Sequence, residues 1–233
     1  MDMATTALNL TNTALDGHKR DVRNLVLLMA GHVESMIASA VRALGGRDPA
    51  LARRTIANDA KVNSAECACD ELCLRILSEH ALASHDLRFV TLALKMVVDI
   101  ERIGDLAVNI CERAIDLSRN PPARSYEDIH RIAELVQVMV RDAIDAFVEA
   151  SVDKARRVIA RDDEVDALYD RAFHAILDDM RTDPTSIHCG IHYQSVAKWL
   201  ERVADHATNI AEQVIFLVDA EDIRHAGRLA STD

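Results

Sequence analysis

Apolar residues recur every three or four positions along most of the chain, which is the period of one face of an α-helix. The first such stripe covers residues 22–44 and predicts a long helix. Two glycines at 45–46 end this helix. Asp48 and Pro49 then begin the next one, as an N-cap residue and a first-turn proline. Residues 1–17 show no such period and predict a flexible leader.

The same pattern predicts four further helices. The second helix extends to about residue 82, and a break near Ser84 leads into a third helix that ends near residue 119. Residues 120–124 contain two prolines and form the clearest linker in the chain. Beyond this linker, Ser125, Ser151 and Asp183 precede apolar stripes and are suited to cap three more helices.

The two halves of the chain repeat one another. Residues 200–212 are a near-copy of residues 100–112, and residues 155–166 resemble residues 52–63 more weakly. The sequence therefore predicts an all-α fold of six long helices, arranged as two pseudo-symmetric three-helix bundles. A helix of about 35 residues is about 50 Å long, so we expect an elongated molecule. The predicted segments are a first unit at 18–120, a second unit at 125–220 and a C-terminal tail at 221–233.

The repeated segments carry oxygen-bearing side chains on one helical face. In each copy Glu, Asp and Asn follow one another at intervals of four residues, which places them one above the other along a helix. The helix before each copy adds an acidic stripe of its own. The candidate metal ligands are Asp59, Asn63, Glu66, Glu101, Asp105 and Asn109 in the first half and Asp162, Asp166, Glu201, Asp205 and Asn209 in the second.

Two interpretations of these faces remain open. A charged face opposite a core is often only solvated, and Arg102 can pair with Asp105 three residues later. Against this, like charges one turn apart repel unless something neutralises them, and no lysine or arginine lies on the face between Glu101 and Glu112. Carboxylate and amide oxygens suit hard cations. The duplication of the arrangement favours metal binding.

Charge and composition narrow the functional classes. A net charge of −11 argues against nucleic acid or an anionic membrane as the main partner. The longest apolar run, residues 25–30, is far shorter than the ~20 residues that span a bilayer. With no signal segment apparent, we expect a cytoplasmic protein. Five cysteines are present, and Cys69 and Cys73 share a helical face that predicts a place in the core.

The residue patterns of common enzymes are missing from the sequence. A di-iron carboxylate oxidase needs Glu-x-x-His on two helices, whereas the chain has one instance, Glu127 with His130. Neither a glycine-rich phosphate loop nor a nucleophile elbow occurs. His188 and His192 have a metal-compatible spacing that more often reflects packing, and His206 is suited to a hydrogen bond. We therefore expect a protein that is not an enzyme.

The repeated motifs resemble those of the PhoU family, the bacterial regulators of phosphate uptake and phosphate signalling. The resemblance covers residues 18–219 and rests on residues 99–110 and 201–212, with Asp-Leu-Arg at 86–88. It implies two three-helix bundles related by a pseudo-twofold axis. It also implies Glu/Asp-x-x-x-Asp motifs that carry multinuclear clusters of iron, or of manganese, zinc or magnesium, at the surface.

The resemblance implies a regulatory role as well. Members of the family connect the phosphate-specific ABC transporter to a sensor histidine kinase and restrain uptake when phosphate is plentiful. The expected partners are thus the ATPase subunit of the transporter and the kinase, with the membrane contacted only through them, and we expect a homodimer. The sequence departs from the family pattern at Asn63, where Asp is usual, at Tyr169, where Glu is usual, and at 83–85, which lack proline. A metal-free helical adaptor and, less favoured, a carboxylate-bridged metal oxidase remain alternatives.

Overall fold

The computed structural model describes residues 3–119, 126–220 and 223, with side chains from residue 13 onward. Every regular element in this part of the chain is helical, which confirms the all-α prediction. The elements are α1 (Met3–Gly46), α2 (Pro49–Ala57), α3 (Asp59–Glu79), α4 (Ser84–Ser118), α5 (Glu127–Glu149), α6 (Val152–Thr182), the 3₁₀ turn η1 (Pro184–Ser186) and α7 (Ile187–Asp219).

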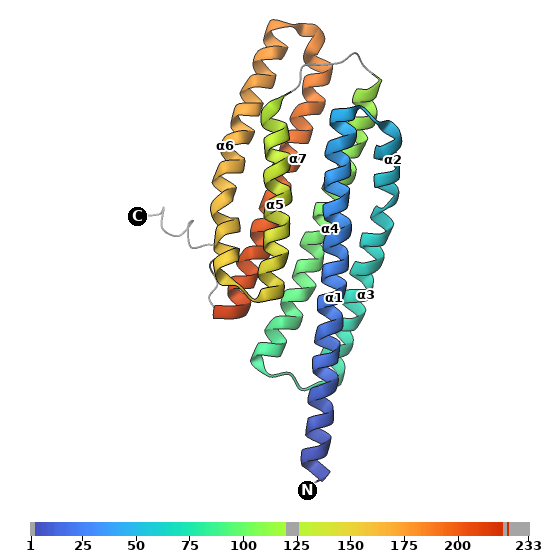
Figure 1. Cartoon of the computed structure of the whole chain (residues 1–233), viewed down its shortest axis with the longest axis vertical. Helices are drawn as coiled ribbons and strands as arrows, with labels where there is room; N and C mark the ends of the chain where they lie inside the picture. Colours follow the sequence, from blue (N-terminus) through green and yellow to red (C-terminus); the bar gives the residue numbers. More distant parts are fainter. Residues whose placement is uncertain (1–2, 120–125, 221–222, 224–233) are drawn as a thin grey trace, which may run out of the picture.

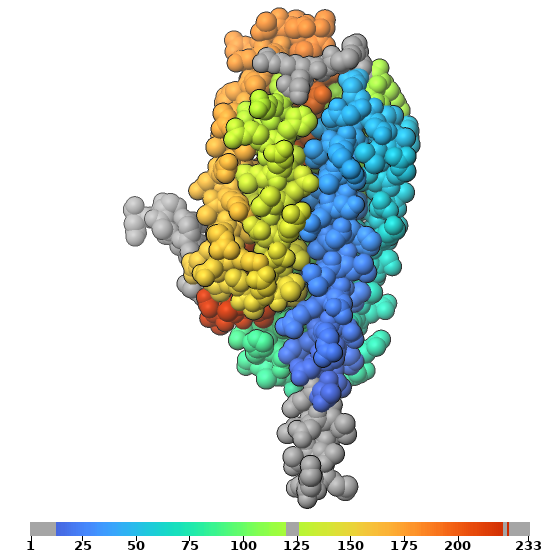
Figure 2. Space-filling view, in the orientation of Figure 1, coloured from blue at the N-terminus to red at the C-terminus, as the bar shows by residue number. Residues whose placement is uncertain are grey.

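The helices form two sets that lie side by side along an elongated molecule (Figure 1). The first set holds α1, α4 and the consecutive pair α2 and α3, and the second holds α5, α6 and α7. The two sets meet where α1 packs against α5 and where α4 packs against α7. In the space-filling view, α1, α5 and α6 cover the face that carries the α1–α5 contact (Figure 2). With α2 and α3 counted as one broken helix, the predicted arrangement of two three-helix units is therefore present.

A single cluster of buried apolar side chains runs through both sets of helices. The stripe predicted at 22–44 lies in it, and Val22, Val26 and Val33 are fully buried. Phe89 of α4 and Phe147 of α5 stack across the two sets, with ring centroids 6.0 Å apart. The two halves thus share one hydrophobic core, because each amphipathic helix buries its apolar face against the others.

Residues Thr13–Gly46 of α1 are long and apolar enough to cross a membrane by length and composition alone. One such helix is weak evidence for a membrane span, since core helices of globular proteins meet the same test. The core-facing stripe of α1 is buried by α3, α4 and α5, which lie against it.

The ends of several helices differ from the sequence-based expectations. The sequence predicts a flexible leader at 1–17, whereas α1 already begins at Met3. This stretch is rich in Ala and Leu, which are good helix formers, and Leu15 is buried. The left-handed residue after α1 is Arg47 rather than one of the two preceding glycines. The helix predicted from residue 49 to about 82 is broken at Asn58 and ends at Glu79.

The capping predictions can be checked at three positions. The Asp48 side chain accepts hydrogen bonds from the backbone N–H groups of Ala50 and Leu51, as expected of an N-cap. Ser151 caps α6 in the same way, which confirms that prediction. Asp183 caps the short turn η1 instead of the long helix α7, whose N-cap is Ser186 without a side-chain hydrogen bond. Ser125 and the linker at 120–124 lie outside the described residues, as does most of the predicted C-terminal tail.

Candidate functional site

The acidic stripes of the first half lie on two neighbouring helices. Asp59, Asn63 and Glu66 belong to α3, and Glu101 and Asp105 belong to α4, which packs against it. The Asn63 amide donates to Asp59 Oδ2 at 3.1 Å. Partial burial raises the pKa of Asp59, Glu66 and Glu101, and the neighbouring Asp105 carboxylate raises each of them further. The structure therefore brings these carboxylates together on one face.

The second half repeats this arrangement on α6 and α7. Partial burial raises the pKa of Asp162 to about 6, helped by the negative charges of Asp205, Asp166 and Glu201. Burial also raises the pKa of Asp166, with Glu201 as the next cause. Asp162 and Asp166 of α6 therefore lie close to carboxylates of α7 that disfavour their charged forms.

Each face also carries one basic residue, so the expectation that the face between Glu101 and Glu112 is free of lysine and arginine is wrong. Arg102 lies 3.3 Å from Asp105 and 3.5 Å from Glu101, measured between nitrogen and oxygen atoms. In the second half the Lys198 ammonium donates to Glu201 Oε1 at 2.7 Å. The Arg102 and Lys198 side chains are 58% and 48% exposed, so solvent weakens both ion pairs. The pair between Arg102 and Asp105 is the contact expected of a solvated face.

One carboxylate oxygen in each half is left without a partner. Asp59 Oδ1 in the first half and Glu201 Oε2 in the second are shielded from solvent and accept no hydrogen bond from any described residue. A buried carboxylate oxygen without a donor is destabilising, and a cation relieves this cost. The donor set of each face, all oxygen, suits a hard cation. In both respects the residues fit a metal ion.

Of the three asparagines in the stripes, Asn63 bonds to a carboxylate of its own face, whereas Asn209 does not. Asn209 is exposed, and its amide donates to Asp99 Oδ1 of α4 at 3.4 Å. It is therefore engaged across the contact between the two halves rather than by the carboxylates of its own half. Asn109, its counterpart on α4, is half-buried.

The carboxylates of the two faces are neighbours, but their oxygens do not converge. Among the described residues, the three-residue group whose ligand atoms all lie within 4.8 Å of one another is His18, Glu79 and His80. This group lies away from both faces, and the spacing of its three residues gives no sign of it in the sequence. Metal binding at the acidic faces would thus require their side chains to turn toward a shared ion.

The remaining candidates from the sequence have structural roles. Cys69 and Cys73 are fully buried, as predicted. The rings of His188 and His192 meet edge to face with centroids 4.7 Å apart, and burial lowers the pKa of His192. The His206 ring makes the expected hydrogen bond, and its partner is the Asp99 carboxylate of α4.

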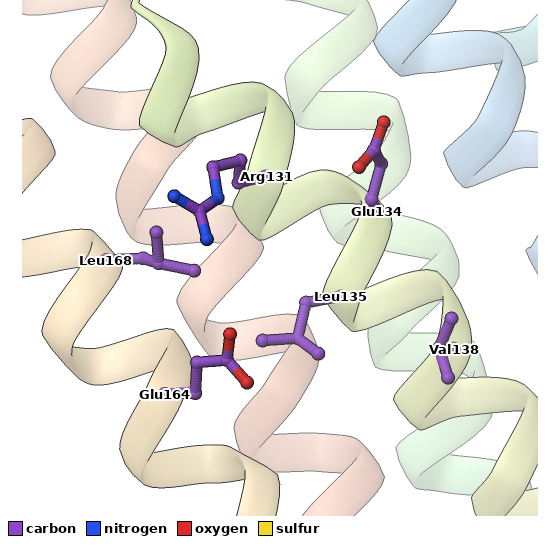
Figure 3. A pocket seen from close by; sticks show the side chains of 6 residues that line it. All are labelled: Arg131, Glu134, Leu135, Val138, Glu164 and Leu168. Carbon is purple, nitrogen blue, oxygen red and sulfur yellow. The ribbon is translucent and has the colours of Figure 1, made fainter.

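A shallow groove of about 290 Å³ lies between α5 and α6 (Figure 3). Arg131 of α5 and Glu164 of α6 border it, beside the apolar side chains of Leu135 and Leu168. The described side chains that line it include no serine, cysteine or histidine, so the groove offers none of the usual nucleophiles.

Comparison with known proteins identifies the family. The PhoU domain model matches twice, at residues 26–114 and 129–214, one match for each half of the chain. The phosphate-specific transport system accessory protein PhoU homolog of Pseudomonas aeruginosa is 39% identical over 208 residues, which cover 89% of this chain and 86% of that protein. The PhoU protein of Escherichia coli is 33% identical over 88% of this chain and 86% of its own length.

Solved structures agree with this result. The crystal structure of PhoU from Pseudomonas aeruginosa superposes with a TM-score of 0.86 at 38% identity, covering 88% of this chain and 99% of that one. The phosphate transport system regulatory protein PhoU from Streptococcus pneumoniae gives a TM-score of 0.84 at 26% identity, covering 90% and 99% of the two chains. The chain therefore belongs to the PhoU family.

Proposed function

We propose that this protein is a negative regulator of phosphate uptake and of phosphate-regulon signalling. The observation that carries the proposal is the match of both halves to the PhoU domain. Its relatives are named as accessory proteins of phosphate-specific transport and as a phosphate transport regulator. They are matched over most of their length, so the inference concerns the whole chain rather than one module.

The protein acts, in this proposal, as an adaptor between two cytoplasmic partners. These are the ATPase subunit of the phosphate ABC transporter and a phosphate-sensing histidine kinase. Two pseudo-equivalent halves with long solvent-facing helices support such a role, because they offer two similar surfaces on one shared core. The proposal places the protein in the cytoplasm, where both partner surfaces are accessible, and includes its assembly as a homodimer.

The proposal extends to metal ions at the acidic faces, with iron first and manganese, zinc or magnesium as the other candidates. Asp59, Glu101 and Asp105 would hold ions in the first half, and Asp162 and Glu201 in the second, with the other stripe residues beside them. A bound cation would neutralise the crowded carboxylates and link α3 to α4 and α6 to α7. The support is the unpartnered oxygen in each half and the raised carboxylate pKa values.

The regulatory role is tested by deleting the gene in its host and measuring phosphate uptake and a phosphate-regulon reporter at high external phosphate. We expect both to rise in the deletion strain and to return to normal when the wild-type gene is restored. The control is Glu71→Gln, which removes an exposed charge of α3 outside the acidic stripe and should complement fully. Unchanged uptake and reporter expression in a strain without a second copy of the gene would refute the proposal.

The metal-binding part is tested separately by thermal melting, with and without iron(II) or manganese(II). An ion that binds only the folded protein raises the melting temperature. Asp105→Asn and Asp205→Asn should each lose much of this rise, because each removes the central carboxylate of one face, while Glu71→Gln should keep it. Equal metal-dependent shifts in all proteins, or none in any, would show that the faces are only solvated.

A metal-free adaptor remains the second candidate. It is favoured by the pairing of Arg102 and Lys198 with carboxylates of the two faces, which neutralises part of their charge without an ion. The metal-dependent and the metal-free adaptor can be distinguished by a binding measurement. It compares the affinity of the purified protein for the cytoplasmic part of the kinase before and after chelation. Unchanged affinity after complete removal of metal favours the metal-free adaptor.

A further inference from the structure

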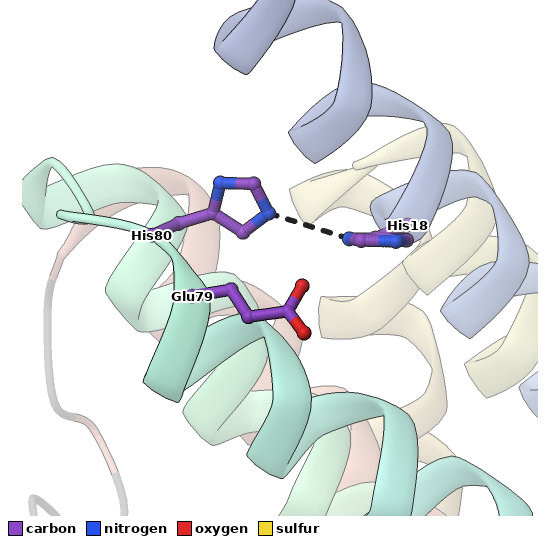
Figure 4. Close-up of side chains that lie close together, drawn as sticks. All are labelled: His18, Glu79 and His80. Atoms are coloured by element: carbon purple, nitrogen blue, oxygen red, sulfur yellow. Dashed lines mark hydrogen bonds between the residues drawn. The ribbon is translucent and has the colours of Figure 1, made fainter.

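Three potential metal ligands meet where α3 ends beside α1. His18 lies on α1, Glu79 is the last residue of α3, and His80 follows it as the C-cap. His18 Nδ1 and His80 Nε2 are 3.4 Å apart, and the Glu79 carboxylate lies beside them (Figure 4). All three ligand atoms lie within 4.8 Å of one another. Both histidines are half-buried, whereas Glu79 is exposed.

We propose that His18, Glu79 and His80 form a binding site for a divalent transition-metal ion of the zinc type. Two imidazole nitrogens and one carboxylate oxygen are a ligand set that zinc accepts readily. The three protein ligands leave the fourth tetrahedral position to a solvent molecule. The site differs in chemistry from the acidic faces, whose donors are all oxygen.

The distance between the two ring nitrogens matches such an ion. Zinc binds histidine nitrogen at about 2.0–2.1 Å, so two nitrogens at tetrahedral positions lie about 3.3 Å apart. The nitrogens of His18 and His80 are 3.4 Å apart. The two rings are tilted by 66° to each other and meet edge to face rather than stacking. The spacing of the two nitrogens is therefore that of the bound state, and an ion between them would replace the hydrogen bond that joins the two rings.

The backbone of His80 is anchored to α3, and burial leaves one ring nitrogen for an ion. The His80 N–H donates to Ile76 O at 3.2 Å, which holds the residue at the end of α3. Its Nδ1 is shielded from solvent and has no hydrogen-bond partner among the described residues. Nε2, which faces His18, is thus the nitrogen available to an external ion. Glu79 is exposed and can complete the site by a side-chain rotation.

The charges around the site do not oppose a cation. Lys19 is adjacent to His18, but its ammonium lies 2.6 Å from Asp86 Oδ1 and 3.6 Å from Asp16 Oδ1. These two carboxylates balance the positive charge of Lys19. The exposed His85, five residues after His80, lies 3.8 Å from the same oxygen of Asp86 and offers a matched control outside the proposed ligand set.

A bound ion would join two helices far apart in sequence. His18 and His80 are separated by 62 positions, so the ion would hold α1 against the end of α3. Glu79 follows Glu66 by 13 residues on the same helix, a rise of about 20 Å along its axis. The site is therefore spatially separate from the acidic face of the first half, and it does not depend on metal binding there.

The test is a titration of reduced, tag-free protein with cobalt(II), followed by displacement with zinc(II). Four-coordinate cobalt with nitrogen ligands absorbs strongly in the visible, whereas cobalt in an all-oxygen, six-coordinate site absorbs weakly. We expect one equivalent of strongly absorbing cobalt in the wild type, displaced by zinc. His18→Ala and His80→Ala should weaken binding by more than the roughly 10- to 100-fold that loss of a supporting hydrogen bond costs. His85→Ala should bind like the wild type.

Circular dichroism establishes that each variant folds. A second probe is Glu79→Gln, which changes an exposed side chain and leaves both histidines intact. We expect it to bind more weakly than the wild type, with zinc raising its melting temperature less. Strongly absorbing cobalt that persists unchanged in His80→Ala, or its absence from the wild type, would overturn the proposal.

Discussion

His206 Nδ1 of α7 lies 2.9 Å from Asp99 Oδ1 of α4, although the two residues are 107 positions apart. The same carboxylate accepts a hydrogen bond from Gln213 Nε2 at 2.9 Å and a longer one from Asn209 Nδ2 at 3.4 Å. The Asp99 side chain is only 14% exposed. Asp99 is thus the polar centre of the contact by which α4 and α7 join the two halves.

This contact breaks the pseudo-symmetry of the repeat. The position that corresponds to Asp99, one hundred residues later, is Trp199, and the position that corresponds to Gln213 is Arg113. The Arg113 guanidinium lies 5.9 Å from the centre of the Trp199 ring, in cation–π geometry. One side of the interface is therefore a hydrogen-bonded carboxylate and the other an aromatic contact, so the two halves are not interchangeable there.

Replacement of Asp99 should destabilise the protein. Asp99→Ala removes the acceptor for His206 and Gln213 and leaves their polar groups unpaired in a partly buried interface. We expect the free energy of unfolding to fall by about 1–3 kcal/mol, measured by denaturant titration. Val98→Ala is the control, since Val98 is 44% exposed and its truncation should change stability by at most about 0.5 kcal/mol. Equal stability of the two variants would contradict this role of Asp99.

The pKa of Asp162 predicts a pH-dependent effect of Asp162→Asn in metal-free protein. Its pKa in the folded protein, about 6, is above the ordinary value of 3.8, so folding favours the protonated form. This contribution to stability is complete below pH 3.8 and is lost as the pH rises through about 6. A neutral asparagine does not suffer that loss. At pH 7 we expect the free energy of unfolding of Asp162→Asn to exceed that of the wild type by about 1 kcal/mol, after allowance for solvent screening. The melting temperature should rise by about 2–4 °C accordingly.

The gain in stability from Asp162→Asn should shrink toward zero at pH 4. At that pH the Asp162 carboxyl of the wild type is largely protonated and resembles the amide. Melting temperatures of both proteins between pH 4 and pH 8, with a chelator present, check this trend. Glu164→Gln, an exposed change on the same helix, should show no comparable trend. A gain that is the same at every pH would contradict the raised pKa of Asp162.

Much of the fold could be predicted from local patterns in the sequence. The apolar stripes locate the long helices, and the duplicated segment relates α7 to α4, because both signals depend on residues within a few turns of one another. The break at Asn58 gave no such signal. Its counterpart by the repeat, Arg161, lies within the uninterrupted helix α6, where it pairs with Asp142 of α5.

The sites were predicted less completely than the fold. The acidic stripes are visible because helical spacing alone aligns their carboxylates. The group of His18, Glu79 and His80 is not visible, since His18 is about 60 positions from the other two and reaches them only through the packing of α1 against α3. The engagement of Asn209 by Asp99 was missed for the same reason, because nothing in the sequence indicates which residues face each other across the two halves.

Gly104 of α4 is a position where alanine should stabilise the protein. A Cβ there would lie 3.6 Å from methyl groups of Val33 and Val62 and 3.7 Å from Asp59 Oδ1, all ordinary contact distances. The repeat already has Ala204 at the equivalent position. Because glycine weakens a helix interior, Gly104→Ala should raise the free energy of unfolding by about 0.5–1 kcal/mol.

Gly190 of α7 provides the opposite case. A Cβ there would lie 2.9 Å from Cγ of Met180 and still closer to its Cε, so Gly190→Ala must displace the Met180 side chain. We expect its melting temperature to fall below that of Gly104→Ala. Gly31→Ala, at a site with no atom within 4 Å, measures the helix-propensity gain alone. A loss of stability in Gly104→Ala, with a gain in Gly31→Ala, would show that the α1–α3–α4 contact cannot accept a methyl group.

The turn between α5 and α6 places an alanine in a conformation that favours glycine. Ala150 has φ 50° and ψ 44°, and the N–H of the next residue, Ser151, donates to Ala146 O at 2.9 Å. This is the Schellman arrangement, in which the left-handed position is usually glycine. An L-residue with a Cβ pays about 1–2 kcal/mol in that conformation, and glycine does not.

Ala150→Gly should therefore raise the free energy of unfolding by about 1 kcal/mol, or the melting temperature by about 2–4 °C. Ala220, which ends α7 with φ 58°, should respond to glycine in the same direction. The matched control is Ala160→Gly at an exposed position within α6, where the same change should lower stability by about 1 kcal/mol. Opposite signs for Ala150→Gly and Ala160→Gly in one set of denaturation curves would establish the left-handed turn. If Ala150→Gly instead lowers stability as Ala160→Gly does, the residue is not held at positive φ in solution.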